Sequence, residues 1–177
     1  MISACIFDLE GVILEPGRLP DLPAYDGLLS PGSAEESRWL KAVHHLMPDD
    51  LRDGVFIFIK ELKNKGLNLA VVSCCPYLRE ILNRLQIRHY FHAFLEGGGA
   101  VPATELYDRA AELLGVSASK VVVFAGSEAG IDAAHAAGCR TVGIGNAEGL
   151  SRADLSLPTL ERARFSKILS AIGEEEE

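Results

Sequence analysis

The sequence has few basic residues for its number of acids, and it has no long apolar run. Its 177 residues include 17 Lys and Arg against 25 Asp and Glu, a net charge of −8, and the chain ends in four glutamates. A chain this acidic does not suit a nucleic-acid backbone, because the phosphates would repel it. The sequence contains no stretch of about 18 apolar residues, the length needed to span a membrane. No basic segment of a signal peptide precedes the first apolar run. We therefore expect a soluble, cytoplasmic protein.

Cysteine is also scarce, and its placement excludes a disulfide-stapled fold. The cysteines lie on or just after predicted buried strands, which predicts reduced structural thiols. They are Cys5, Cys74, Cys75 and Cys139. The neighbouring pair Cys74 and Cys75 leaves metal or redox chemistry open, but no His or second Cys pair follows at zinc spacing. The five histidines form no ligand cluster, and we expect the adjacent His44 and His45 on the flank of a helix.

An alternation of apolar runs and helical patterns is what the sequence does contain. Short apolar runs predict strands at 2–8, 67–73, 90–95, 120–124 and 140–144. Helical spacing predicts helices at 34–47, 53–65, 76–85, 104–114, 128–137 and 160–172. Uniformly apolar strands that alternate with helices are typical of a parallel sheet covered on both faces. We therefore predict an α/β fold with a doubly wound parallel sheet, in a single domain over residues 1–177.

Residues 13–50 interrupt this alternation. Proline and glycine recur through residue 32, and Ser33 with Glu36 then forms a capping box for one amphipathic helix. We interpret 13–50 as a small insertion, and we expect the face that carries Trp39 to pack on the core. A glycine-rich run at 143–149 lacks the G-x-G-x-x-G spacing and comes late in the chain, which excludes a nicotinamide cofactor.

The first predicted strand ends at Asp8, shortly before Gly11. In an open α/β sheet, ligands bind at the carboxyl edge of the strands, near a change in strand order. Asp8 is therefore a candidate reactive residue, although an aspartate after a strand can also simply form a turn.

The run FDLEGV at residues 7–12 resembles the first motif of the haloacid dehalogenase superfamily, especially its β-phosphoglucomutase-like branch. That motif reads Asp-x-Asp-Gly-Val. Its first aspartate is the nucleophile that accepts a phosphoryl group, and its second is the general acid/base. The resemblance implies that Asp8 is the nucleophile and Glu10 the acid/base, and that the Asp8 carboxylate and the Glu10 carbonyl would bind Mg²⁺. Glu10 is one methylene longer than the family's aspartate, a displacement of about an ångström that can cost about a hundred-fold in rate.

The second and third motifs are only partly kept. The run VVS at 71–73 resembles the second motif, which implies that Ser73 hydrogen-bonds the phosphoryl oxygens, although a serine at a strand end needs no function. In the third motif a lysine neutralises both the nucleophile and the phosphate. Val101 stands at its position, and no basic residue between 96 and 104 replaces it.

The fourth motif keeps its frame and loses its acids. The run FAGSEAGIDAAHAAG at 124–138 has Ala125 and Gly126 where the family has its acidic magnesium ligands. A shifted register would make Asp132 the distal acid. Glu128 lies one turn nearer the loop and is a further candidate ligand, or else a first-turn glutamate favoured by the helix dipole.

These departures have a large expected effect on phosphoryl transfer, which depends on positioning and charge neutralisation. The loss of one such group costs about 2.7 to 4 kcal/mol, and the loss of the lysine and the acids together would cost about 10⁴ to 10⁶ in rate if they act independently. The small cap is also expected to leave Asp8 open to solvent.

The resemblance thus implies a haloacid dehalogenase fold with a reduced helical cap, and two functions remain open. In the first, the protein is a degenerate, phosphatase-like pseudoenzyme that binds a phosphorylated ligand or a protein partner and needs no cofactor. In the second, it is a weak or unusual Mg²⁺-dependent phosphatase or β-phosphoglucomutase-like enzyme, with an aspartyl-phosphate on Asp8 and with Glu128 or Asp132 completing the metal site.

Overall fold

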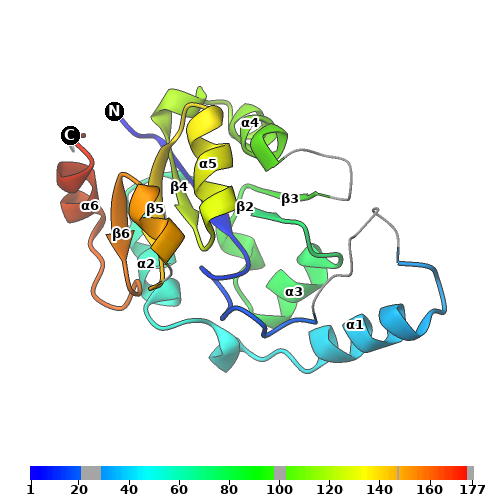
Figure 1. Ribbon diagram of the computed structural model, residues 1–177. Helices are drawn as coiled ribbons and strands as arrows, with labels where there is room; N and C mark the ends of the chain where they lie inside the picture. The colour runs from blue at the N-terminus through cyan, green and yellow to red at the C-terminus, as the bar shows by residue number, and fades with distance from the viewer. Residues whose placement is uncertain (21–28, 98–102, 147, 175–177) are drawn as a thin grey trace.

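A parallel sheet forms the centre of the molecule. The computed structural model describes residues 1–20, 29–97, 103–146 and 148–174. Within them six strands pair in parallel, in the order β3-β2-β1-β4-β5-β6 (Figure 1). No helix in this part of the chain is long and apolar enough to cross a membrane.

The strands and helices alternate along the chain. The strands are β1 (Ala4–Asp8), β2 (Asn68–Ser73), β3 (Ala93–Glu96), β4 (Val121–Ala125), β5 (Arg140–Ile144) and β6 (Leu155–Leu157). The helices are α1 (Ala34–His44), α2 (Val55–Asn64), α3 (Leu78–Arg84), α4 (Ala103–Leu113), α5 (Glu128–Ala136) and α6 (Phe165–Ala171). Single 3₁₀ turns are η1 (Pro48–Asp50), η2 (Arg88–Tyr90) and η3 (Ala118–Lys120), and a longer one is η4 (Glu148–Arg152).

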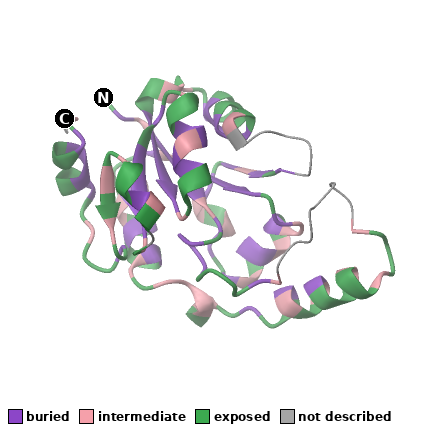
Figure 2. Ribbon diagram, viewed as in Figure 1, coloured by how far each residue is buried: buried purple, intermediate pink, exposed green. Residues whose placement is uncertain are grey.

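Each face of the sheet is covered by its own set of helices. Successive side chains of a strand point to opposite faces, and in β1 Phe7 joins one apolar cluster while Ile6 joins the other. Buried residues of α2, α3 and α6 belong to the cluster on the Phe7 face, which α1 joins through its contacts with α3, and those of α4 and α5 belong to the cluster on the Ile6 face. The central strands β1, β2 and β4, between these two layers, are almost wholly buried (Figure 2). The predicted doubly wound α/β fold is therefore confirmed.

The order of the strands reverses beside β1. From β1 the chain proceeds outward through β2 to β3, and it then returns to the other side of β1 to add β4, β5 and β6. This reversal creates a switch point between β1 and β4, where ligands bind in such sheets. Asp8 is the last residue of β1, so it lies at the carboxyl edge of this switch point.

Three segments differ from those that the periodicity predicts. The strand β6 was not expected, because its three residues are half-buried or exposed and are too few to show a pattern. The last helix starts at Phe165 and not near 160, since Leu160 to Arg164 form turns before it. The segment before β3 is also partly helical, because η2 occupies Arg88 to Tyr90.

The described part of the segment 13–50 is tied to the body of the molecule. Leu14 forms an isolated antiparallel bridge with Leu51. Trp39, which is 1% exposed, lies in the main apolar core, as expected. The hydroxyl of Tyr77, next to α3, donates to Glu36 of α1 at 3.1 Å. The exposed His44 and His45 lie on the flank of α1, also as expected. The boundaries of this insertion stay a prediction.

Candidate functional site

A cavity of about 490 Å³ lies at the carboxyl ends of β1, β2 and β4. Three residues that the motifs single out, Asp8, Glu10 and Ser73, line it together. Its other described lining residues are Leu9, Gly11, Pro16, Pro20, Val72, Cys74, Cys75, Leu106, Tyr107, Gly126, Ser127, Ala129 and Gly130. We call this the Asp8 cavity. Glu128 and Asp132 are not among its described lining residues.

The carboxylate of Asp8 is held by donors from two other elements. The hydroxyl of Tyr107, on α4, donates to Asp8 Oδ1 at 2.7 Å, and the backbone N–H of Gly126 also donates to this carboxylate. Its other oxygen fits against Gly130 of α5, where a Cβ atom would come within 2.8 Å of Oδ2. The small cap was expected to leave Asp8 open to solvent, but Asp8 is only partly exposed.

Burial raises the pKa of Asp8 to about 7, although the hydrogen bonds from Tyr107 and Gly126 act in the opposite direction. Some of the residue remains accessible, yet most of the space around its carboxyl group is filled by protein. At neutral pH this group is therefore divided between its charged and neutral forms.

Tyr107 is the site residue that the sequence did not reveal. It lies 99 positions after Asp8 and is 3% exposed. Burial, with the neighbouring charge of Asp8, raises the pKa of its hydroxyl well above the usual range, so the hydroxyl acts as a donor. A tyrosine on the apolar face of a helix has the pattern of a core residue, and only the pairing of β1 with its neighbours brings α4 over Asp8.

Glu10 and Ser73 both contact the cysteine pair. The Cys75 thiol donates to Glu10 Oε1 at 2.6 Å, and its backbone N–H donates to Ser73 Oγ at 2.9 Å. All four cysteines are free thiols, as predicted; Cys5, Cys75 and Cys139 are buried, and Cys74, just after β2, is exposed. Burial and the charge of Glu10 raise the pKa of both Cys74 and Cys75, so neither has the depressed pKa of a reactive cysteine.

Glu128 and Asp132 both face an arginine. Arg152, on η4, places its Nη1 2.8 Å from Glu128 Oε1 and 2.9 Å from Asp132 Oδ2. All three side chains are largely exposed. The structure thus brings the two acids together with each other, but with a cation and outside the Asp8 cavity.

The fold and the cavity define a doubly wound α/β protein whose candidate site lies at the switch point of its sheet, with a carboxylate at the end of the first strand. Comparison with known proteins agrees. The model of the family described as haloacid dehalogenase-like hydrolase matches residues 34–144. This chain belongs to that family of phosphatases and phosphomutases. The match begins after residue 33, so the role of Asp8 rests on its own motif.

Two curated relatives have moderate identity to this chain. It is 31% identical to a β-phosphoglucomutase of Bacillus subtilis (strain 168) over 116 residues, which cover 64% of this chain and 51% of that protein. It is 33% identical to a phosphoglycolate phosphatase of Pectobacterium atrosepticum over 130 residues, which cover 67% of this chain and 55% of that protein. The chain thus spans about half the length of these relatives.

Solved structures share the fold at low sequence identity. A β-phosphoglucomutase from Clostridium difficile superposes with a TM-score of 0.81 at 20% identity, covering 98% of both chains. A haloacid dehalogenase family hydrolase from Deinococcus radiodurans, with bound phosphate and sodium, gives a TM-score of 0.73 at 21% identity, covering 97% of this chain and 96% of that one.

Phosphatases and mutases of this family are generally Mg²⁺-dependent, and the described residues do not fit that ion well. Magnesium prefers an octahedron of oxygen ligands. No group of three or more His, Cys, Asp or Glu in the described ranges could hold a metal. At Gly126 a Cβ atom would lie 2.6 Å from Gly11 Cα and 2.7 Å from the Glu10 carbonyl oxygen, so an acid there has no room. Val101 lies outside the described residues, and the metal role of Glu128 or Asp132 stays a prediction.

Proposed function

We propose that this protein is a catalytically degenerate member of its family, which works by binding a partner and not by efficient phosphoryl transfer. The observation that carries the proposal is the state of Asp8. Two donors, the Tyr107 hydroxyl and the Gly126 N–H, bind the carboxylate that would have to attack phosphorus. Two hydrogen bonds lower the basicity of the carboxylate, and its raised pKa leaves part of it protonated at neutral pH, so Asp8 is a weakened nucleophile.

The charge of the Asp8 cavity supports this proposal. Among its described lining residues, Asp8 and Glu10 are acids and none is Lys, Arg or His. Two nearby arginines are engaged elsewhere, Arg52 by the Gly11 carbonyl and Glu15, and Arg18 by Asp50. The neighbouring stretches of sequence, 21–28 and 98–102, contain no basic residue.

Without a cation among its described lining residues, the Asp8 cavity is a poor site for a phosphate dianion. Two unit charges of the same sign about 4 Å apart repel by about 4 kcal/mol at the effective dielectric of a protein surface. Glu10 and the ionised fraction of Asp8, with no cation among the described lining residues, therefore disfavour a phosphorylated small molecule. Of the two kinds of partner that the sequence leaves open, we propose a protein.

One observation favours the second candidate function, a weak Mg²⁺-dependent phosphatase or β-phosphoglucomutase-like enzyme. Asp8, Glu10 and Ser73 line the same cavity, as the family motifs require. Ser73 Oγ accepts the Cys75 N–H, so the Ser73 hydroxyl still has a hydrogen to donate to a ligand.

Hydrolysis assays separate the two functions. An aryl phosphate and a panel of sugar phosphates are incubated with the protein, with and without Mg²⁺, and Asp8→Asn controls for contaminating phosphatases. We expect no turnover above the Asp8→Asn background. Turnover that requires Mg²⁺ and is lost in Asp8→Asn would overturn the proposal, and Glu128→Gln and Asp132→Asn would then locate the acid that holds the metal.

A further inference from the structure

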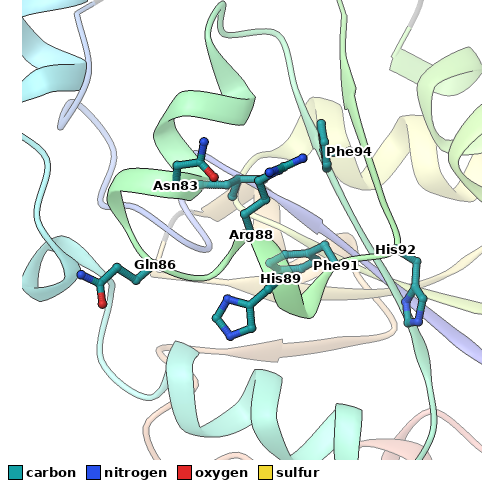
Figure 3. A pocket seen from close by; sticks show the side chains of 8 residues that line it. Asn83, Gln86, Arg88, His89, Phe91, His92 and Phe94 are labelled. Carbon is teal, nitrogen blue, oxygen red and sulfur yellow. The ribbon is translucent and has the colours of Figure 1, made fainter.

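A second cavity lies beside the amino end of β3, the edge strand of the sheet. It measures about 590 Å³ and is lined by residues from the end of α3, from η2 and from the start of β3. None of its described lining residues lines the Asp8 cavity, which lies at the carboxyl ends of the strands. We call it the β3-edge cavity. Figure 3 shows Arg88 with its guanidinium toward Phe94, and His89 and His92 on either side of Phe91.

Two hydrogen-bond donors face each other at this cavity. His92 Nδ1 accepts the backbone N–H of Leu69 at 3.0 Å, so the neutral ring must carry its hydrogen on Nε2. That Nε2 lies 3.2 Å from the Nζ of Lys63, an ammonium group that can only donate. The pair lacks an acceptor, and an anionic oxygen beside both nitrogens would supply one.

Two arginines add positive charge around Phe94, and one of them, Arg88, lines the cavity. The guanidinium carbons of Arg79 and Arg88 lie 5.0 Å and 5.5 Å from the centre of the Phe94 ring. Neither arginine pairs with a carboxylate in the part of the chain that the structure describes.

From these contacts we propose that the β3-edge cavity binds a small organic oxyanion, with its carboxylate or phosphate group on the Lys63–His92 pair and its apolar part against Phe91 and Phe94. Arg88, which also lines the cavity, adds electrostatic attraction for the anion. Guanidinium and ammonium groups are the side chains that bind such anions, and arginine can do so with two parallel hydrogen bonds. The cations gather here in a protein whose net charge is −8. This site goes beyond the proposed function and does not depend on it.

Amide shifts in the NMR spectrum of the ¹⁵N-labelled full chain test this proposal. Phenylphosphonate, which a phosphatase cannot hydrolyse, and benzoate are titrated separately at constant ionic strength, with sodium chloride as the control. We expect saturating shifts that centre on residues 86–94 with at least one probe, and the tighter probe identifies the anionic group. No saturating shift with either probe, or equal shifts with chloride, would overturn the proposal.

Variants give the matched comparison. We expect Arg88→Gln and Lys63→Gln each to weaken binding at least fivefold. Lys60→Gln is the control, because Lys60 lies on the same helix as Lys63 and stacks on Phe56, 5.4 Å from the ring centre. Lys63 is on the surface, so its variant reports on binding even where Arg88→Gln disturbs folding. Equal weakening by Lys60→Gln, or shifts that centre on the Asp8 cavity and are lost in Asp8→Asn, would contradict the assignment.

Discussion

Replacing Asp8 by asparagine should stabilise the fold at pH 8. Raising the pKa of a carboxyl group from 3.8 to about 7 makes its ionised form cost about 4 kcal/mol of folding free energy. Two effects reduce this gain. Asp8 is partly exposed, and the NH₂ group of asparagine would face donors whose hydrogen bonds the carboxylate accepts. We expect a net gain of about 1–3 kcal/mol, or roughly 3–9 °C in melting temperature for a chain of this size.

The pH dependence of this gain follows from the sign of the shift. Between pH 4 and pH 7 the native state keeps the Asp8 proton and the unfolded state does not, so the wild-type protein loses stability as the pH rises and then levels off. The advantage of Asp8→Asn should therefore be absent near pH 4, grow up to pH 7 and stay constant above it.

Urea unfolding at pH 4.5, 6 and 8 measures this gain directly. Asp132→Asn is the matched control, because Asp132 is an exposed acid outside the Asp8 cavity and its replacement should change stability by no more than about 0.5 kcal/mol. If Asp8→Asn is less stable than wild type at pH 8, or if its effect does not change with pH, burial of the Asp8 charge is not what shapes this site.

Four further predictions concern the neighbours of this site and the rest of the core. Tyr107→Phe removes the donor to Asp8 and should lower the free energy of unfolding in urea by about 1.5–3 kcal/mol at pH 8 and by less at pH 5. An equal loss at both pH values would mean that the hydroxyl does not act on the Asp8 charge. Gly126→Asp should destabilise by about 1–3 kcal/mol and leave phosphatase assays unchanged with Mg²⁺, and a Mg²⁺-dependent gain in turnover would contradict the steric argument. Trp39→Ala should lower the free energy of unfolding by about 3–5 kcal/mol, measured by circular dichroism. A much smaller loss would mean that α1 is dispensable for the core. Burial acts to raise the pKa of Asp154, but the hydrogen bonds from Thr141 and from His135 outweigh it and lower this pKa. Asp154→Asn should therefore be less stable than wild type at pH 7 and approach wild type as the pH falls below 3.8. A stability difference that persists in acid would refute this.

The departures from the family motifs acquire a physical meaning in the structure. At Gly126 an acidic side chain would not fit, because the backbone of Glu10 and Gly11 occupies the space that such a side chain would need. Similarly, Glu128 is more than a displaced ligand, because Arg152 binds it. In the described residues, neither position offers a free acid to a metal beside Asp8.

Much of the fold could be predicted because it depends on local patterns. Apolar runs such as β4 and the capping of α1 by Ser33 are encoded within a few consecutive residues. The three-residue strand β6 could not be predicted, since its pairing with β5 and not its own sequence makes it a strand.

The candidate site divides in the same way. The sequence by itself determined the α/β class and the position of Asp8 at a strand end, because residue type and spacing along the chain are sufficient for both. The departures at the motif positions depend in addition on the resemblance to the family. Only the tertiary structure decided that Tyr107 binds Asp8, that Arg152 binds Glu128 and that Lys63 meets His92. These contacts join residues 24 to 99 positions apart, and no short-range pattern encodes them because they form only when the strands have paired and the helices have packed.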